Sequence, residues 1–230
     1  IDYGRHAKDI VILNGQICGS GQDLELEIFG VTHQSRLPLP GDFQTANALA
    51  AVGLAVSTGM PVDRAVQALS KLKSVPGRMN LVANHPNGAN IYVDYAHTPD
   101  ALRSMLSALR AHVKGGLHIV FGCGGNRDPG KREEMGRLAA SKADYVIVTD
   151  DNPRTEDPES IRKEILIGCP GATEVSDRAE AIAASILALA PGDALVISGK
   201  GHEVLQDIGG QMVPFDDAEI ARQVVQGLIA

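Results

Sequence analysis

Short apolar runs that end in polar, glycine-rich loops recur along the second half of this chain, and they constrain its fold more than any other feature. The runs at 119–121, 145–148 and 194–197 have the length and the apolar composition of buried strands. Segments with helical apolar spacing lie between them, and strands that alternate with helices indicate a parallel sheet covered by helices. Because ligands bind outside the carboxyl ends of the strands in such a sheet, the three loops predict one shared site.

The predicted order of elements supports this interpretation. One helix is predicted to begin after Thr98, which is a suitable N-cap, with Pro99 at its first position and Asp100 in its first turn. We predict strands at 90–94, 117–121, 144–149, near 173 and at 193–198, and further helices at 131–141, 158–167, 177–190 and 217–229. This order is typical of a Rossmann-like, doubly wound α/β domain, which we place at residues 78–230.

Residues 1–77 carry a different pattern and are predicted to form a separate part of the molecule. Residues 24–29 alternate apolar with acidic side chains, as a half-buried strand does, and residues 9–13 are predicted to form another strand. Two helices are expected after these strands. One includes residues 47–58 and has Asp42 as a possible N-cap, and the other covers residues 64–72.

Two segments bound this first part. Val75-Pro76-Gly77 has the composition of a linker, and it places the domain boundary near Arg78. The first residues, Ile1–Gly4, contain no initiator Met, and strand-like runs follow them closely. We therefore expect the chain to begin in the middle of a domain.

Composition and charge exclude several classes of function. The net charge is −7 and no basic run occurs, which argues against nucleic-acid binding. No apolar segment approaches the ~20 residues needed to cross a bilayer, so no membrane partner is expected. The three cysteines are widely spaced and none lies in a C-x-x-C pair, which predicts neither disulfides nor zinc and favours the cytoplasm.

The loop Gly122–Asp128 contains three glycines but is not a dinucleotide-binding fingerprint, because Arg127 stands where the third glycine of that pattern would be. Arg127 either reaches a ligand or is a solvated arginine in an ordinary turn. Gly130-Lys131-Arg132 and Gly199-Lys200-Gly201 resemble the end of a phosphate-binding loop, but the pattern G-x-x-x-x-G-K-[ST] is absent from the sequence.

The other loops also allow two interpretations each. Asp151-Asn152-Pro153-Arg154 is either a turn that leads into a helix or a turn that aims Arg154 at a carboxylate. Asp94 ends a predicted strand, where it is suitably placed for a ribose hydroxyl, whereas a lone histidine such as His97 is more often structural. Glu203 either receives an ammonium group or faces solvent in the first turn of a helix.

Four motifs that occur in order resemble those of the Mur ligase family, most closely its members that add diaminopimelate. They are Asp94-Tyr95-Ala96-His97-Thr98-Pro99-Asp100, Gly122-Cys123-Gly124-Gly125-Asn126-Arg127-Asp128, Asp151-Asn152-Pro153-Arg154 and Gly199-Lys200-Gly201-His202-Glu203. Gly41-Asp42-Phe43 with Asn47, and Gly77-Arg78-Met79, match the same pattern. The resemblance implies that residues 1–77 are the tail of a central ATP-binding α/β domain, and that residues 78–230 are the carboxyl-terminal domain, which binds the amino acid.

The reaction that the resemblance implies is an ATP-dependent amide ligation in peptidoglycan synthesis. ATP phosphorylates the D-glutamate carboxylate of UDP-N-acetylmuramoyl-L-alanyl-D-glutamate, and the amine of meso-2,6-diaminopimelate then attacks the acyl phosphate. The family's phosphate-binding loop and its Mg²⁺ ligands would lie before Ile1. We therefore expect no catalytic or metal-binding residue within these 230 residues, and no ATP turnover by them alone.

The resemblance also implies roles for particular residues. Diaminopimelate would contact Arg127, Asp151, Asn152, Pro153, Arg154, Gly199 and Glu203. Arg154 would select it over lysine, which lacks the distal carboxylate. ATP would contact Asn47, Arg78, Asp94 and His97. The chain departs from the family at Gln44, where Asn is frequent, and at Glu133, where Pro is common. The first departure affects a nucleotide contact, and the second lies at a predicted helix start.

Two other functions compete with this one. The chain could be a stand-alone module that binds diaminopimelate without catalysis. It could also be a nucleotide-dependent oxidoreductase on a Rossmann-like sheet, although the missing third glycine argues against that.

Overall fold

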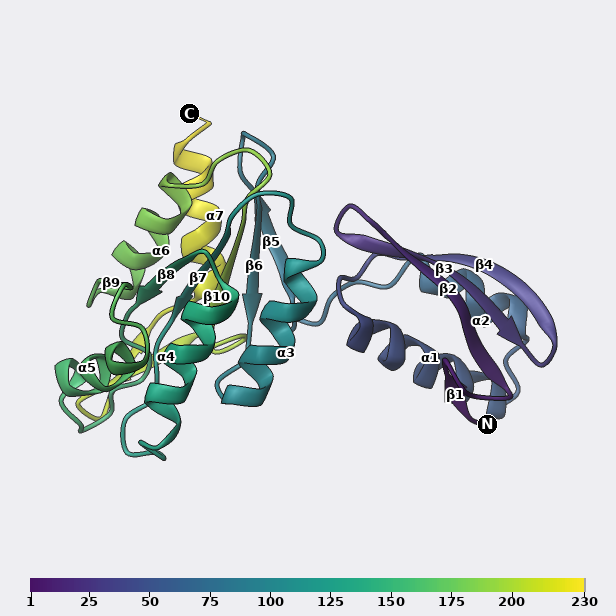
Figure 1. Cartoon of the computed structure of the whole chain (residues 1–230), viewed down its shortest axis with the longest axis horizontal. Coiled ribbons are helices and arrows are strands. Elements are labelled where there is room, and N and C mark those ends of the chain that lie inside the picture. The colour runs from purple at the N-terminus through teal and green to yellow at the C-terminus, as the bar shows by residue number, and fades with distance from the viewer. Residues whose placement is uncertain (230) are drawn as a thin grey trace. The chain divides into compact units, whose positions relative to one another are not determined.

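The computed structural model describes residues 1–229, and within them the chain divides into two compact units (Figure 1). The first unit is Ile1–Ser74, and the second begins at Val75. Each unit has a sheet and a hydrophobic core of its own. The boundary between the units thus falls inside the segment that precedes Arg78.

The first unit is a four-stranded sheet with two helices packed on one face. Its elements are β1 (Tyr3–Gly4), β2 (Ile10–Cys18), β3 (Gly21–Ile28), β4 (Val31–Leu37), α1 (Asp42–Ser57) and α2 (Val62–Leu69). The strands follow one another in sheet order, and β2, β3 and β4 are antiparallel. The predicted alternation in β3 is confirmed, because Leu24, Leu26 and Ile28 are buried against the helices.

Two helix boundaries in this unit differ from the predictions. Asp42 was predicted to be an N-cap, but Gly41 occupies that position with a φ of 95°, which glycine adopts at little cost. Asp42 instead lies in the first turn, where a carboxylate still suits the helix dipole. The second helix begins at Val62 rather than at residue 64 and ends at Leu69 rather than at residue 72.

The second unit contains a six-stranded sheet in the order β5-β6-β10-β7-β8-β9. Its strands are β5 (Asn80–Asn84), β6 (Asn90–Asp94), β7 (Leu117–Phe121), β8 (Tyr145–Val148), β9 (Thr173–Glu174) and β10 (Ala194–Ser198). The pairs from β6 to β9 are parallel, as predicted. The edge strand β5 runs antiparallel to β6 and was not predicted.

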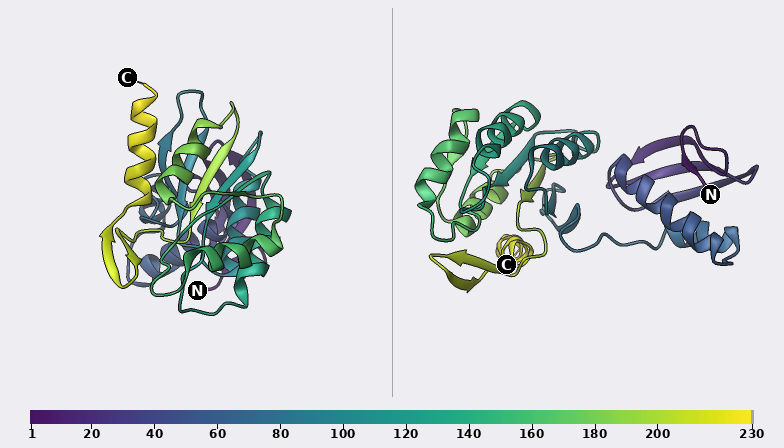
Figure 2. Two further views of the ribbon diagram at one scale, coloured as in Figure 1. Left: turned by 90° about the vertical axis from the view of Figure 1, so that its left-hand side faces the viewer. Right: turned by 90° about the horizontal axis from the view of Figure 1, so that it is seen from below.

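Helices cover both faces of this sheet, which confirms the doubly wound prediction (Figures 1 and 2). The helices are α3 (Pro99–Arg110), α4 (Lys131–Lys142), α5 (Pro158–Gly168), α6 (Arg178–Leu187) and α7 (Asp217–Gly227). Side chains of α3, α4 and α5 belong to one core, and those of α6 and α7 belong to the other. Because apolar layers lie on both sides, β7 and β10 are buried along their whole length.

A small hairpin follows the loop after β10, and the sequence analysis did not predict it. It consists of β11 (Leu205–Ile208) and β12 (Gln211–Pro214), which pair antiparallel. Glu203 lies in the irregular segment two residues before this hairpin, so the alternative that placed Glu203 in the first turn of a helix is wrong. The Thr98 cap is confirmed, because the Thr98 side chain accepts from the backbone N–H of Ala101.

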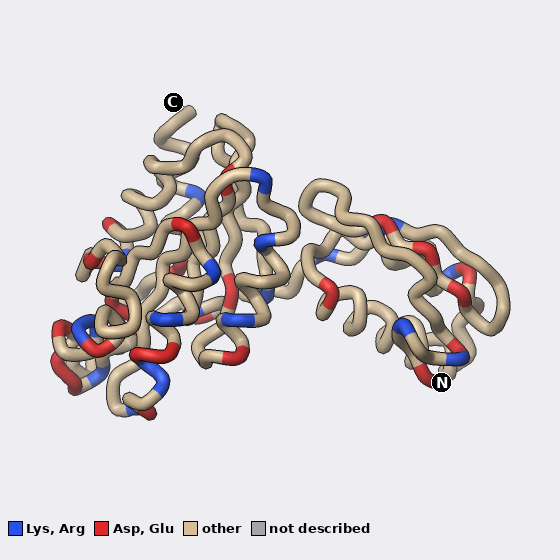
Figure 3. Tube along the Cα trace, viewed as in Figure 1, with Lys and Arg blue, Asp and Glu red and all other residues tan. Residues whose placement is uncertain are grey.

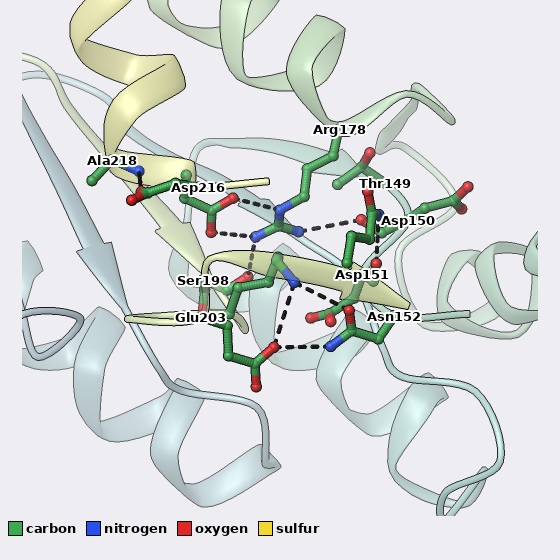
Figure 4. Close-up of polar contacts among 12 residues, drawn as sticks. Thr149, Asp150, Asp151, Asn152, Arg178, Ser198, Glu203, Asp216 and Ala218 are labelled. Atoms are coloured by element: carbon green, nitrogen blue, oxygen red, sulfur yellow. Dashed lines mark hydrogen bonds and ion pairs between the residues drawn. The ribbon is translucent and has the colours of Figure 1, made fainter. Parts of the chain in front are cut away.

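A buried ion pair joins the N-terminal ends of α6 and α7 to the carboxyl end of β10 (Figure 4). Arg178 and Asp217 are fully buried, and Nε and Nη2 of Arg178 donate to the two carboxylate oxygens at 2.7 and 2.8 Å. Nη2 of the same guanidinium also donates to the backbone carbonyl of Ser198 at 3.0 Å. Burial alone would lower the pKa of Arg178, but the carboxylates of Asp217, Asp151 and Glu203 together outweigh it and raise this pKa.

We expect Asp217→Ala to lower the free energy of unfolding by about 3–5 kcal/mol, because it leaves the Arg178 guanidinium buried without its counterion. The neighbouring Asp216→Ala removes only the α7 N-cap and should cost about 0.5–2 kcal/mol. Urea denaturation of both variants measures the difference. Equal losses in the two variants would contradict the importance given to the pair.

Candidate functional site

The loops after β6, β7, β8 and β10 surround one pocket of about 440 Å³ at the carboxyl edge of the six-stranded sheet. This is the edge at which the sequence placed the site. In Figure 3, Lys and Arg are intermixed with Asp and Glu around the loops of this unit. The pocket is lined by Tyr95, His97, Thr98, Gly124, Arg127, Asp128, Lys131, Asp151, Asn152, Arg154, Gly199 and Glu203.

The glycine-rich loop after β7 packs directly on the loop after β8. A Cβ at Gly122 would collide with the carbonyl of Thr149, and a Cβ at Gly125 would collide with the carbonyl of Pro153. The backbone N–H of Gly125 donates to the carbonyl of Asn152 at 2.9 Å. The glycines therefore permit close contact between two loops of the chain, which explains their presence without a phosphate ligand.

The hairpin fixes the backbone of Arg154 in an unusual conformation. Arg154 has a φ of 54°, in the left-handed region that few non-glycine residues occupy. Its N–H donates to the carbonyl of Asp207 at 3.0 Å, and its carbonyl accepts from the N–H of Gly209 at 2.7 Å. Nη1 donates to the carbonyl of Gly125 at 2.7 Å. Nε and Nη2 make no hydrogen bond within residues 1–229, so they are available to a carboxylate.

Asp151 is a buried carboxylate on the pocket wall. Its side-chain oxygens accept no hydrogen bond from the described part of the chain. Burial raises its pKa above the ordinary value of 3.8, although the charges of Arg178 and Lys200 act in the opposite direction. Its backbone carbonyl is fixed by Nε2 of Gln206 at 2.5 Å. Such a group can accept hydrogen bonds from an ammonium group of a ligand.

The side chains of Asn152 and Glu203 point toward each other on the same wall of the pocket as Asp151 (Figure 4). Nδ2 of Asn152 donates to Oε2 of Glu203 at 2.9 Å. Gly199, which begins the loop that carries Glu203, has a φ of 117° and lies against the Asp151 side chain. The wall thus combines a hydrogen-bond donor and two carboxylates beside the guanidinium of Arg154, a combination that suits a ligand with both an ammonium and a carboxylate group.

Of the residues expected to hold diaminopimelate, Arg127, Asp151, Asn152, Arg154, Gly199 and Glu203 all line this pocket. Pro153 lies outside its lining and faces the adjacent hollow beside Ile208. Lys131 and Asp128 also line the pocket, although they were not proposed. Lys131 stands at the start of the helix predicted at 131–141, and its likeness to a phosphate-binding lysine gave no indication of this pocket.

The residues expected to contact ATP are more scattered. Both carboxylate oxygens of Asp94 accept from backbone N–H groups, those of Met79 at 2.7 Å and Ala96 at 2.8 Å. Burial raises the pKa of Asp94 despite these bonds. The Arg78 guanidinium lies 5.1 Å from the ring centre of Tyr95, His97 lines the pocket, and Asn47 is an exposed residue of α1 in the first unit.

Within residues 1–229 no group of three or more His, Cys, Asp and Glu side chains is arranged to hold a metal ion. No helix in that range is long and apolar enough to span a membrane. Cys18, Cys123 and Cys169 are free thiols, in agreement with their spacing.

This chain is similar in sequence and in structure to known proteins of one family. Residues 77–201 match the family described as "Mur ligase, glutamate ligase domain". A protein of Chelativorans sp. strain BNC1 named UDP-N-acetylmuramoyl-L-alanyl-D-glutamate--2,6-diaminopimelate ligase is 52% identical over 205 residues, which is 89% of this chain and 42% of that protein. A protein of the same name from Zymomonas mobilis is 48% identical over 98% of this chain and 47% of its own length.

A solved structure of a protein with that name is also similar. It superimposes with a TM-score of 0.76 at 38% identity, and the match covers 98% of this chain and 47% of the other. This chain therefore spans a little less than half the length of the relatives that it matches.

The raised pKa of Asp151 predicts a pH-dependent cost in stability. In the folded state the Asp151 carboxyl group holds its proton to a higher pH than in the unfolded state. Deprotonation therefore destabilises the folded state as pH rises through the folded-state pKa of Asp151. Asp151→Asn should therefore raise the free energy of unfolding at about pH 7.5, by about 1.4 kcal/mol for each unit by which the folded pKa exceeds the unfolded one. The gain should vanish as pH falls below 3.8.

Urea denaturation at several pH values measures this difference. Asp100→Asn, which removes an exposed carboxylate from the first turn of α3, is the matched control. A gain for Asp151→Asn that stays constant with pH would contradict the interpretation.

Proposed function

The chain belongs to the Mur ligase family, and from that premise we propose that its second unit binds the amino acid which a diaminopimelate-adding ligase joins to its nucleotide substrate. The observation that carries this proposal is the convergence of Arg127, Asn152, Arg154 and Glu203 on one pocket. Membership of this family accounts for the Rossmann-like sheet, so the fold gives no support to an oxidoreductase function.

The distal end of meso-2,6-diaminopimelate carries one carboxylate and one ammonium group. We assign the carboxylate to Nε and Nη2 of Arg154, which have no partner within residues 1–229, with Nδ2 of Asn152 as a further donor. The ammonium group then meets Glu203 and the buried carboxylate of Asp151, next to Gly199. Arg127, an exposed residue on the rim, is left for the proximal carboxylate.

Arg154 is the residue that distinguishes diaminopimelate from lysine. Lysine has the same chain and ammonium group but no distal carboxylate, so it would leave the guanidinium without a partner in a partly enclosed pocket. Leaving one member of such a charged pair without its partner costs about 2–5 kcal/mol of binding free energy. The turn that holds Arg154 is therefore a determinant of specificity as well as of binding.

The reaction proposed for the whole protein is the ATP-dependent addition of meso-2,6-diaminopimelate to UDP-N-acetylmuramoyl-L-alanyl-D-glutamate in the cytoplasm. In this chain the pocket would orient the amine for attack on an activated carboxylate, and such positioning can supply much of the rate. Asn47, Arg78, Asp94 and His97 are proposed ATP contacts. The described residues offer no group of His, Cys, Asp and Glu side chains suited to Mg²⁺.

Calorimetry with meso-2,6-diaminopimelate and with L-lysine tests the assignment of Arg154. We expect the unmutated chain to prefer diaminopimelate, and Arg154→Ala to weaken its binding by at least about 30-fold, because a charge-assisted pair is lost. Binding of L-lysine should change little, since lysine does not use the guanidinium.

Arg137→Ala is the control, because it removes the same charge from an exposed position on α4. It should leave both affinities unchanged. Equal binding of the two amino acids by the unmutated chain would contradict the proposal.

A further inference from the structure

Lys200 is a fully buried cation beside the pocket, and the proposed function does not use it. Its side chain has no solvent exposure, and its ammonium group does not line the pocket. Nζ donates to the carbonyl of Leu205 at 2.6 Å and to Oδ1 of Asn152 at 3.1 Å. It also lies 3.4 Å from Oε2 of Glu203.

These contacts determine which way the amide of Asn152 points. Oδ1 accepts from Nζ of Lys200 and from the N–H of Asp207 at 3.0 Å, so both of its lone pairs are used. The amide nitrogen must therefore point the other way, and it donates to Oε2 of Glu203. The opposite rotamer would place an NH₂ group against an ammonium and a backbone N–H, which is strongly unfavourable.

The same contacts also restrict the position of the Glu203 carboxylate. Oε2 is engaged by Asn152 and lies close to Lys200, whereas Oε1 accepts no hydrogen bond within residues 1–229 and remains available. The side chain of Glu203 is 35% exposed, so Asn152 and Lys200 restrict it from one side only. The pocket therefore presents a fixed donor next to a fixed acceptor before any ligand arrives.

We propose that Lys200 is a positioning residue that orients Asn152 and Glu203 for the ammonium and carboxylate groups of the incoming amino acid. This inference rests on the proposed function for the identity of the ligand, but not for the orientation of the amide. A lysine kept only for stability would lower the free energy of unfolding when replaced, because the Leu205 carbonyl loses its donor, but it would leave the affinity of the folded chain unchanged. The distinguishing expectation is thus lost affinity in a chain that still folds.

The first test compares Lys200→Met with the unmutated 230-residue chain by calorimetry with meso-2,6-diaminopimelate. We expect the dissociation constant to rise by about tenfold or more in a chain that still folds, with a modest fall in the urea midpoint because the Leu205 carbonyl loses its donor. Lys163→Met is the matched control, since it removes an ammonium group from an exposed position on α5 and should leave both quantities unchanged. Unchanged affinity in Lys200→Met would overturn the inference.

A double-mutant cycle tests whether Lys200 acts through Asn152. If it does, Lys200→Met should weaken binding much less in an Asn152→Ala background than in the unmutated chain. Full additivity of the two losses would overturn the proposed route.

Lys200→Gln, which keeps a donor, should recover part of the affinity lost in Lys200→Met. If Lys200→Met fails to fold while Lys200→Gln folds and binds like the unmutated chain, the role is structural and the inference is wrong.

A readout without ligand separates this inference from the proposed function. In ¹⁵N spectra of the free chain, the hydrogen-bonded side-chain amide of Asn152 should exchange its protons slowly with water, and Lys200→Met should speed this exchange and shift both proton signals. If the unmutated chain binds no diaminopimelate but these signals behave as expected, the proposed function fails and the positioning of Asn152 stands. Signals that are identical in the two proteins would overturn the positioning role in either case.

Discussion

The hydrogen bonds between the β11–β12 hairpin and the turn after β8 are the constraint on which the rest of the site depends. They hold Arg154 at a positive φ, where an arginine is not expected to remain without support. The same hairpin supplies the N–H of Asp207 to the side chain of Asn152 and the side chain of Gln206 to the backbone of Asp151. A peripheral hairpin therefore aligns three residues of the pocket, Asp151, Asn152 and Arg154.

Sheet topology explains why residues distant in sequence meet at this point. Strand β10 pairs between β6 and β7, so the loop that carries Glu203 lies between loops that come from much earlier in the chain. The Arg178–Asp217 pair stabilises the same region from behind, because the guanidinium also contacts the carbonyls of Asp150 and Ser198 at the ends of two strands. The ends of these strands contribute both to stability and to the pocket. The burial of Asp151, which the charges of Arg178 and Lys200 offset only in part, lowers stability at this place.

Sequence periodicity predicted the parallel core of the second unit well, since strands buried on both faces give continuous apolar runs such as 117–121. It failed where tertiary contacts decide the structure. The hairpin is largely exposed and lacks an apolar run, although Gly209-Gly210 between two short segments was an available turn signal. The role of Lys200 could not be predicted, because its burial depends on contacts with Asn152, 48 residues away.

The most direct measurement is a crystal structure of this chain soaked with meso-2,6-diaminopimelate. The account predicts the distal carboxylate within hydrogen-bond distance of the Arg154 guanidinium and of Nδ2 of Asn152, and the distal ammonium group on Oε1 of Glu203. The Asn152 amide should keep the orientation that it has without ligand. A ligand bound with its distal end away from Arg154, or an inverted Asn152 amide that accepts from the ammonium group, would contradict it.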